Sequence, residues 1–222
     1  MRVVRGDAAE IRMNEAMAAL VEGVDLVSAR DLGWLADLRE TEWAGDLWYL
    51  LTGGWIRHSS GALVLAHGRV VDDVKPVDLT GREDLANRSY LPRSGLDLSA
   101  DDAMTVLAVR GDSLVWDLLA RIDKGLNPGV VTGFVGVHRR PDGAPDGSLG
   151  IHEHHDGEHG LWALDDLEGY REEAVLAVTV TPDFTASPAI LPPRESLYPD
   201  EPAECASSHE EETVQHKERE SS

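Results

Sequence analysis

The sequence predicts an α+β fold in which a helical N-terminal segment packs on a small mixed β-sheet, followed by a disordered acidic C-terminal tail. Apolar residues recur at helical spacing up to about residue 56, and short strand-like runs follow from residue 62. This patterning disappears near residue 191, where prolines and acidic residues take over. The predicted units are a helical, Trp-rich segment over 1–60, a mixed α/β sheet domain over 61–190 and a disordered acidic tail over 191–222.

The first unit is predicted to be helical over residues 8–56. Asp7 is a candidate N-cap with Glu10 in the first turn, and a broad apolar face follows. That face consists of Ile11, Met13, Ala16, Met17, Leu20, Val21 and Val24. Two further helical stretches are predicted around 32–38 and 43–51. Four of the six tryptophans fall in this region, where aromatic side chains at helical spacing are typical of a core or an interface: Trp34, Trp43, Trp48 and Trp55.

Short strands are predicted after this helical region. The first candidates are the apolar runs at 62–66, 69–71 and 74–77, each bounded by turn residues. Residues 78–102 are polar and contain Gly81, Pro92 and Gly95, so they are predicted to form a long loop whose path the sequence leaves open.

The clearest predicted unit spans residues 104–137. It reads as a strand at 104–109, a helix at 114–122 and a second strand at 129–137, which together predict a β-α-β unit with parallel strands. Later strands are predicted at 148–152, 161–164 and 174–181, with turns at Pro141-Asp142-Gly143 and Pro145-Asp146-Gly147.

The charge of the chain limits its partners. The formal net charge is −21, and a field of this sign repels nucleic acid and anionic membranes, so direct binding to either is not expected. A protein that imitates DNA and occupies a basic partner would be the exception. The single cysteine, Cys205, allows no intrachain disulfide. No secretory signal and no apolar stretch near the roughly 20 residues that span a bilayer are visible, so a cytoplasmic protein is expected.

Histidines and carboxylates gather in Gly150–Gly160. If this segment is a strand followed by a turn, His152 and His154 share a face, and His159 returns to them across the turn. Imidazoles are common zinc ligands, so these three histidines are the predicted ligands of zinc or another divalent metal. Glu153 or Glu158 would then be the general base that acts on a metal-bound water. An exposed polar turn has the same composition, and that interpretation stays open.

Two family resemblances involve the middle of the chain. Residues 104–137, with Gly111-Asp112-Ser113-Leu114 and Pro128–Phe134, resemble the opening of the PPC domain, a trimeric α/β domain of plants and prokaryotes. In that family a His-x-His pair and a further histidine follow, and His152, His154 and His159 would match them. The interval between Val131 and His152 is shorter than the strands of that family require.

The second resemblance is to the phage prohead (capsid maturation) proteases. Residues 118–126 and 129–134 are similar to the segment that carries the serine of that family, and residues 176–182 are similar to its closing strand. Val131 occupies the position of the serine, with Thr132 beside it. The resemblance therefore implies an inactive relative.

The motifs of several common enzyme classes are missing from the sequence. It contains no P-loop, no Gly-x-Ser-x-Gly and no Cys-x-x-Cys. The sequence thus predicts a soluble, acidic, non-catalytic binding protein that is oligomeric and has a protein partner or self-associates. The alternative is a metal-dependent enzyme of the hydrolase type that uses His152, His154 and His159.

Overall fold

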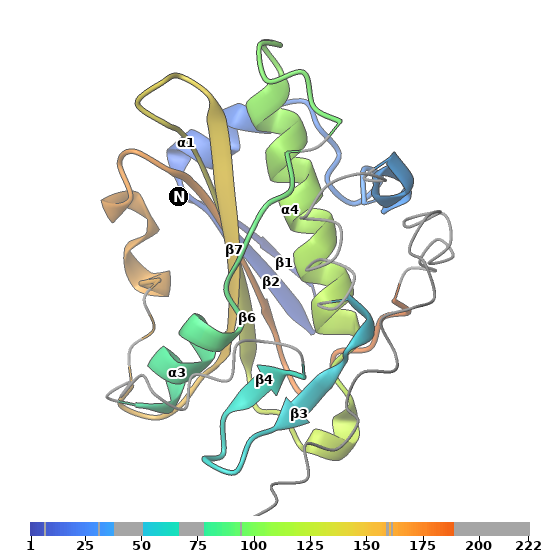
Figure 1. Ribbon diagram of the computed structural model, residues 1–222. Coiled ribbons are helices and arrows are strands. Elements are labelled where there is room, and N and C mark those ends of the chain that lie inside the picture. The colour runs from blue at the N-terminus through green and yellow to red at the C-terminus, as the bar shows by residue number, and fades with distance from the viewer. Residues whose placement is uncertain are drawn as a thin grey trace, which may run out of the picture.

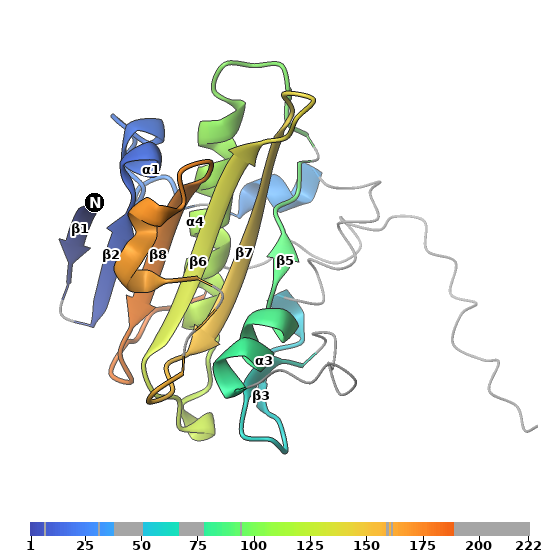
Figure 2. The same cartoon turned by 90° about the vertical axis from the view of Figure 1, so that its left-hand side faces the viewer.

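A computed structural model describes residues 1–6, 8–30, 32–37, 51–66, 78–93, 95–158, 160 and 162–188. The described chain has an α+β architecture, as predicted. A six-stranded antiparallel sheet carries helices on its faces, and a separate two-stranded hairpin lies near one end (Figures 1 and 2).

The sheet brings together segments from both ends of the described chain. Its strand order is β1 (Arg2–Arg5), β2 (Ala9–Met13), β8 (Ala174–Val180), β6 (Val131–Arg139), β7 (Pro145–Glu153) and β5 (Ser89–Tyr90). Every one of these strand pairings is antiparallel. In the β6–β7 hairpin Val131 lies opposite Glu153, so the start of β6 and the end of β7 share one end of the sheet.

One face of the sheet is covered by the long helix α4 (Ala103–Ala120), which crosses β6 and β7 (Figure 1). Leu107, Leu114 and Leu118 of this helix are fully buried in the main core. The helix approaches β6 closely because Gly133 has no side chain: a Cβ there would lie 2.5 Å from Cγ1 of Val115. The smaller helix α1 (Glu15–Leu20) begins at Asn14, whose side chain accepts a hydrogen bond from the Met17 N–H.

The opposite face carries a smaller apolar cluster. Phe134, Trp162, Leu167, Val175 and Ala177 are buried together there. The 3-10 segment η3 (Leu164–Gly169) supplies part of the cover and lies in front of the sheet in Figure 2. Because successive residues of a strand point to opposite faces, β6 and β8 contribute to both clusters.

The predicted β-α-β unit and the mixed sheet are wrong. Residues 104–109 form the first half of α4, so the strand that would open the PPC-like pattern is absent from this part of the chain. An apolar run of six residues fits a buried helix as well as a buried strand, and the run from 104 to 120 is long enough for a helix. Without a parallel crossover, the strands of the described sheet pair antiparallel.

The prediction of a helical region over 8–56 is also wrong in part. Residues 9–13 form strand β2, in which Ile11 and Met13 point to the same face and pack in the main core. Among the described residues up to 56, helix follows at α1, in the short 3-10 segment η1 (Gly33–Asp37) and at residues 51–52. Residues 38–50, with Trp43 and Trp48, lie outside the described residues, as do 67–77, His159 and the predicted tail over 191–222.

The segment predicted as a loop over 78–102 contains α3 (Leu79–Ala86) and strand β5. α3 packs against β7 and against the hairpin of β3 (Trp55–Arg57) and β4 (Leu63–Leu65). The predicted strands at 62–66, 129–137, 148–152 and 174–181 correspond to β4, β6, β7 and β8 and are confirmed. The 3-10 segment η2 (Lys124–Leu126) precedes β6. Among the described helices, none is long and apolar enough to cross a membrane.

Candidate functional site

The candidate site lies where α3 meets the end of β7. The N-terminus of α3 is held by two carboxylates. Asp78 accepts a hydrogen bond from the Gly81 N–H at 2.7 Å, and Glu158 accepts from the N–H and the hydroxyl of Thr80 at 2.8 and 3.0 Å. Burial opposes ionisation of Glu158, but the donors of Thr80 hold its pKa below its usual value. The loop after β7 is thereby fixed to the start of α3.

Glu83 of α3 and Asn87, the residue that caps the C-terminal end of this helix, lie between β4 and β7, and we call this pair the α3 bridge. Asn87 accepts from the Leu65 N–H and donates to the carbonyl oxygens of Leu63 and Ile151, each at 2.9 Å. Glu83 accepts from the backbone N–H groups of Leu63 and Glu153, both at 2.6 Å. The α3 bridge thus does for β4 and β7 what a further strand would do, because it satisfies their facing backbone groups.

Glu83 is an ionisable group that is completely buried. Burial raises its pKa, and the backbone donors from Leu63 and Glu153 offset only part of that effect. Nε2 of His155 lies 3.2 Å from Oε1 of Glu83 and adds a third polar partner. The carboxyl of Glu83 is therefore both a structural acceptor and one half of a carboxyl–imidazole pair.

Glu153, at the end of β7, forms the second half of this junction. Its carboxylate is paired with the guanidinium of Arg57 and accepts from the Gly129 N–H. Burial opposes ionisation, yet Arg57 and the Gly129 N–H hold the pKa of Glu153 below its usual value. Arg57 also donates to the carbonyl oxygens of Gly61 and Leu126 at 3.0 and 3.1 Å, so it ties the β3–β4 hairpin to the segment before β6.

Glu83, Glu153 and His155 together form a group that could hold a metal ion. One donor atom from each of the three side chains lies within 4.8 Å of the other two. Two carboxylates and an imidazole are suitable ligands for zinc or manganese. An ion bound here would share Glu153 with Arg57 and Glu83 with two backbone N–H groups, so it would compete with the contacts that hold the junction together.

The imidazole of His152 points to the other face of β7. Nδ1 of His152 lies 2.7 Å from Oδ1 of Asp84, and both residues are buried. The ring lies 5.3 Å from the ring of Phe134 and 5.7 Å from that of His154, measured between centroids. His152 therefore joins α3 to the smaller apolar cluster through a carboxyl–imidazole contact.

His154 contacts a hydroxyl group. Its Nε2 lies 2.7 Å from Oγ1 of Thr132, which lies 2.9 Å from Oγ1 of Thr179. Partial burial, followed by the neighbouring His152, lowers the pKa of His154 and so favours its neutral form. A neutral imidazole beside a hydroxyl is the arrangement in which a base activates a nucleophile. Thr132 is fully buried, however, so its hydroxyl holds His154 in place and offers no surface to a substrate.

The predicted site residues thus lie in three environments. The rings of His152 and His154 lie close together, but one nitrogen of each ring already contacts another side chain. Nδ1 of His152 contacts Asp84, and Nε2 of His154 contacts Thr132. Glu153 lies on the opposite face, and Glu158 holds the start of α3. The predicted ligand His159 lies outside the described residues.

Two members of the carboxylate–imidazole group were not predicted. Glu83 comes from a polar stretch that reads as a loop, and nothing in its local sequence marks it as buried. His155 belongs to the histidine-rich segment, but the two-residue period of a strand favours His152 and His154 instead. The contact across 72 positions between His155 and Glu83 is visible only in the fold.

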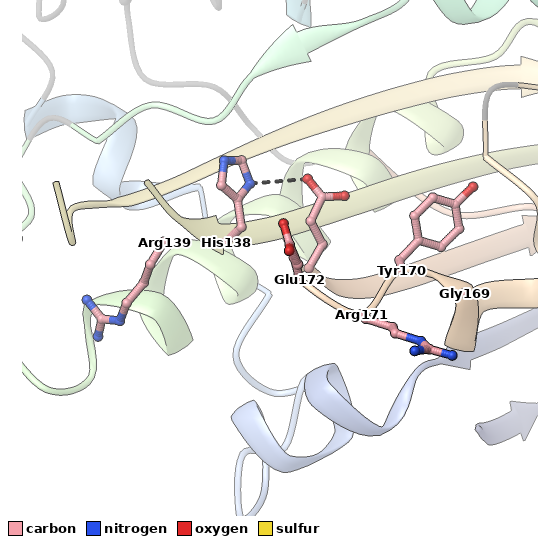
Figure 3. A pocket seen from close by; sticks show the side chains of 7 residues that line it. His138, Arg139, Gly169, Tyr170, Arg171 and Glu172 are labelled. Atoms are coloured by element: carbon pink, nitrogen blue, oxygen red, sulfur yellow. Dashed lines mark ion pairs between the residues drawn. The ribbon is translucent and has the colours of Figure 1, made fainter. Parts of the chain in front are cut away.

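A surface pocket of about 570 Å³ lies at the opposite end of β6. Its lining includes His138 and Arg139 from β6 and the segment Gly169–Glu173 before β8 (Figure 3). Nδ1 of His138 lies 3.2 Å from Oε1 of Glu173. Arg139, Arg171 and Glu172 give the pocket charges of both signs, with no cluster of one sign that would select a ligand class.

Comparison with known proteins finds no matching family model, no significantly similar curated protein and no significantly similar solved structure. Val131, which holds the serine position in the resemblance to prohead proteases, is buried in the main core.

Proposed function

We propose that this protein is a non-catalytic binding protein that takes up an extended protein segment by strand addition at β1. The observation that carries the proposal is the open edge of the sheet. β1 is the terminal strand, and in the described part of the chain it pairs only with β2 (Figure 2). An unpaired strand edge presents backbone N–H and C=O groups in a row that another strand can bind.

The hydrogen bonds around β2 identify which groups of β1 face outward. The Gly6 N–H donates to the Ala9 carbonyl, and the Asn14 N–H donates to the Val175 carbonyl on the other side of β2. Because inward and outward groups alternate along an antiparallel strand, Arg2 and Val4 bond toward β2. The backbone groups of Val3 and Arg5 are then directed toward the open edge.

The side chains of β1 suit an interface. All four residues of the strand are exposed, and Val3 and Val4 are 39% and 44% exposed. Exposed β-branched side chains give an incoming strand apolar contacts on both faces of the sheet. Arg5 pairs with Glu10, with Nε 2.6 Å from a carboxylate oxygen, and Glu10 also pairs with Arg12 on β2.

The histidine-rich region supports the non-catalytic part of the proposal. Glu83, Glu153, His152 and His154 each contact backbone or side-chain groups that join α3, the β3–β4 hairpin and the sheet. Groups used in this way stabilise the arrangement of the elements. A catalytic group would instead need to reach a substrate.

Strand addition can be tested with displayed peptides. Random extended heptapeptides would be selected on the full chain, and bound sequences would be compared on a Val3→Pro variant, which removes an outward N–H but no bond to β2. We expect the selected peptides to lose at least tenfold in affinity on Val3→Pro and to keep it on Val27→Ala, a change at a residue 65% exposed away from the sheet. They should also slow amide exchange at Val3 and Arg5. Equal binding to both variants would contradict the proposal.

A second candidate function is divalent metal binding by Glu83, Glu153 and His155. The closeness of their three donor atoms favours it. The chain, purified without a histidine tag, would be analysed by elemental mass spectrometry beside the His155→Ala and His154→Ala variants. Near-stoichiometric zinc or manganese that is lost in His155→Ala and kept in His154→Ala would support this site. Metal lost only in His154→Ala would favour the originally predicted histidine set, and metal absent from wild type would remove both.

A further inference from the structure

We infer that the strand that pairs with β1 is the β1 strand of a second copy of this chain, so that two sheets join across a two-fold axis. This inference rests on the proposed function, because it names the occupant of the same edge. Antiparallel pairing of an edge strand with its own copy is self-complementary, and it closes the assembly at two copies.

The outward backbone groups allow a symmetric register centred on Val3. In a pairing centred on Val3, the N–H of Val3 donates to the carbonyl of Val3 in the second copy, and the reverse bond forms by symmetry. Val3 lies in the middle of the exposed stretch, so this register uses outward groups on both sides of the axis. A pairing centred on Val4 would instead place a non-hydrogen-bonded pair at the axis and bond the outward groups of Val3 to those of Arg5 in the second copy, and disulfide trapping distinguishes the two registers.

The side chains are compatible with the register centred on Val3. Val3 meets Val3 of the second copy on one face of the joined sheet, and Arg2 lies opposite Val4 of the second copy on the other face. No two arginines are directly opposite each other, so the like-charge penalty of a cross-strand pair is avoided. Arg5 already pairs within each copy with Glu10, a carboxylate that it shares with Arg12. Charge compatibility and apolar contact therefore both favour a second copy at this edge.

The size of the interface limits its strength. A four-residue strand pair buries well below the ~1,200 Å² that stable interfaces need, and each copy has a formal net charge of −21. Repulsion between the copies is screened beyond about 8 Å at physiological ionic strength. The expected species is a dimer that forms at high protein concentration, increases with salt and dissociates on dilution.

Disulfide trapping tests both the pairing and its register. Val3→Cys, Val4→Cys and Val27→Cys would each be made in full-length chains that also carry Cys205→Ser. Across a strand pair, opposite Cα atoms lie about 4.5–5.5 Å apart, within the range that a disulfide spans. In the register centred on Val3, the two Val4 Cα atoms are about 8 Å apart, beyond that range. Val3→Cys should therefore cross-link at least fivefold faster than Val4→Cys and Val27→Cys, and light scattering should show Val3→Pro as a monomer at concentrations where wild type dimerises.

Each outcome decides the inference. Rapid cross-linking at Val3 alone, with a monomeric Val3→Pro, supports the second copy in this register. A wild type that stays monomeric up to about 0.5 mM, with Val3→Cys no faster than Val27→Cys, overturns the inference. If displayed peptides still bind at Val3 in that case, the edge has a different occupant and the proposed function stands. If they do not bind either, the proposed function fails as well.

Discussion

Asn87→Ala gives the sharpest test of how the α3 bridge holds the molecule together. Asn87 is fully buried and makes three hydrogen bonds, each 2.9 Å long, to the backbone of β4 and β7. Its side chain therefore joins β4 of the hairpin to β7 of the main sheet. Asn87 is the residue that caps the C-terminal end of α3, and alanine at this position keeps the backbone and removes only the side-chain amide.

The expected loss in the free energy of unfolding depends on the backbone groups that lose their hydrogen-bond partner in Asn87→Ala. Truncation leaves the Leu65 N–H and the Leu63 and Ile151 carbonyls without their amide partner in a buried place. Each buried backbone group that loses its partner costs about 1–3 kcal/mol, and a water molecule that enters the vacated space recovers part of this. We expect a loss of about 3–5 kcal/mol in the free energy of unfolding, against about 0.5 kcal/mol or less for Arg88→Ala, an exposed neighbour.

Urea unfolding followed by tryptophan fluorescence measures this difference, because Trp55 lies in the hairpin and Trp162 on the far face of the sheet. The two variants should unfold with the same dependence on urea concentration as wild type if only stability changes. Amide exchange at Leu63 and Leu65 would show whether the hairpin separates first. A loss below about 1 kcal/mol for Asn87→Ala, similar to Arg88→Ala, would refute the bridge as a main support of this junction.

Three further predictions concern other contacts. Gly133→Ala places a Cβ 2.5 Å from Cγ1 of Val115, so it should lower stability by about 1–3 kcal/mol in urea titrations, and adding Val115→Ala should recover part of that loss. Burial raises the pKa of Asp112 above 3.8, with Arg30 offsetting part of the effect, so its contribution to stability is present at low pH and is lost as pH rises through the raised pKa. The stability advantage of wild type over Asp112→Asn should consequently narrow as pH rises above about 4, and an advantage that widens would contradict this sign. If the second candidate function holds, a chelator should lower the melting temperature of wild type but not of His155→Ala.

The sequence predicts correctly those helices and strands whose hydrophobic pattern agrees with the way they are buried in the fold. The turn at Pro141-Asp142-Gly143 correctly separates the apolar strands β6 and β7, whereas the turn predicted at Pro145-Asp146-Gly147 is wrong because these residues begin β7. The apolar face at 114–122 likewise predicts the second half of α4. In these segments the preferences of the backbone and the burial of one face agree, so composition is sufficient.

The wrong predictions for α3 and for the first half of α4 arise because burial in these helices does not follow a simple hydrophobic pattern. In α4 the residues at 104–109 are apolar on most sides because both the sheet and the N-terminal region cover the helix, so periodicity does not separate helix from strand. The buried polar side chains of α3 and its C-cap are Thr80, Glu83, Asp84 and Asn87, and of these Glu83 and Asn87 satisfy the backbone of β4 and β7. A helix whose buried face is polar shows no apolar periodicity, so its sequence is predicted to be a loop.

The sequence by itself determined that a charged, histidine-rich segment follows a strand, and that neighbouring histidines alternate between its faces. Only the tertiary structure decided what those histidines contact. Glu83 and Asp84 reach His155 and His152 from α3, about 70 positions earlier in the chain, and the hairpin brings Arg57 to Glu153. Contacts of this kind depend on how the elements pack. The spacing of residues along the chain carries no information about them.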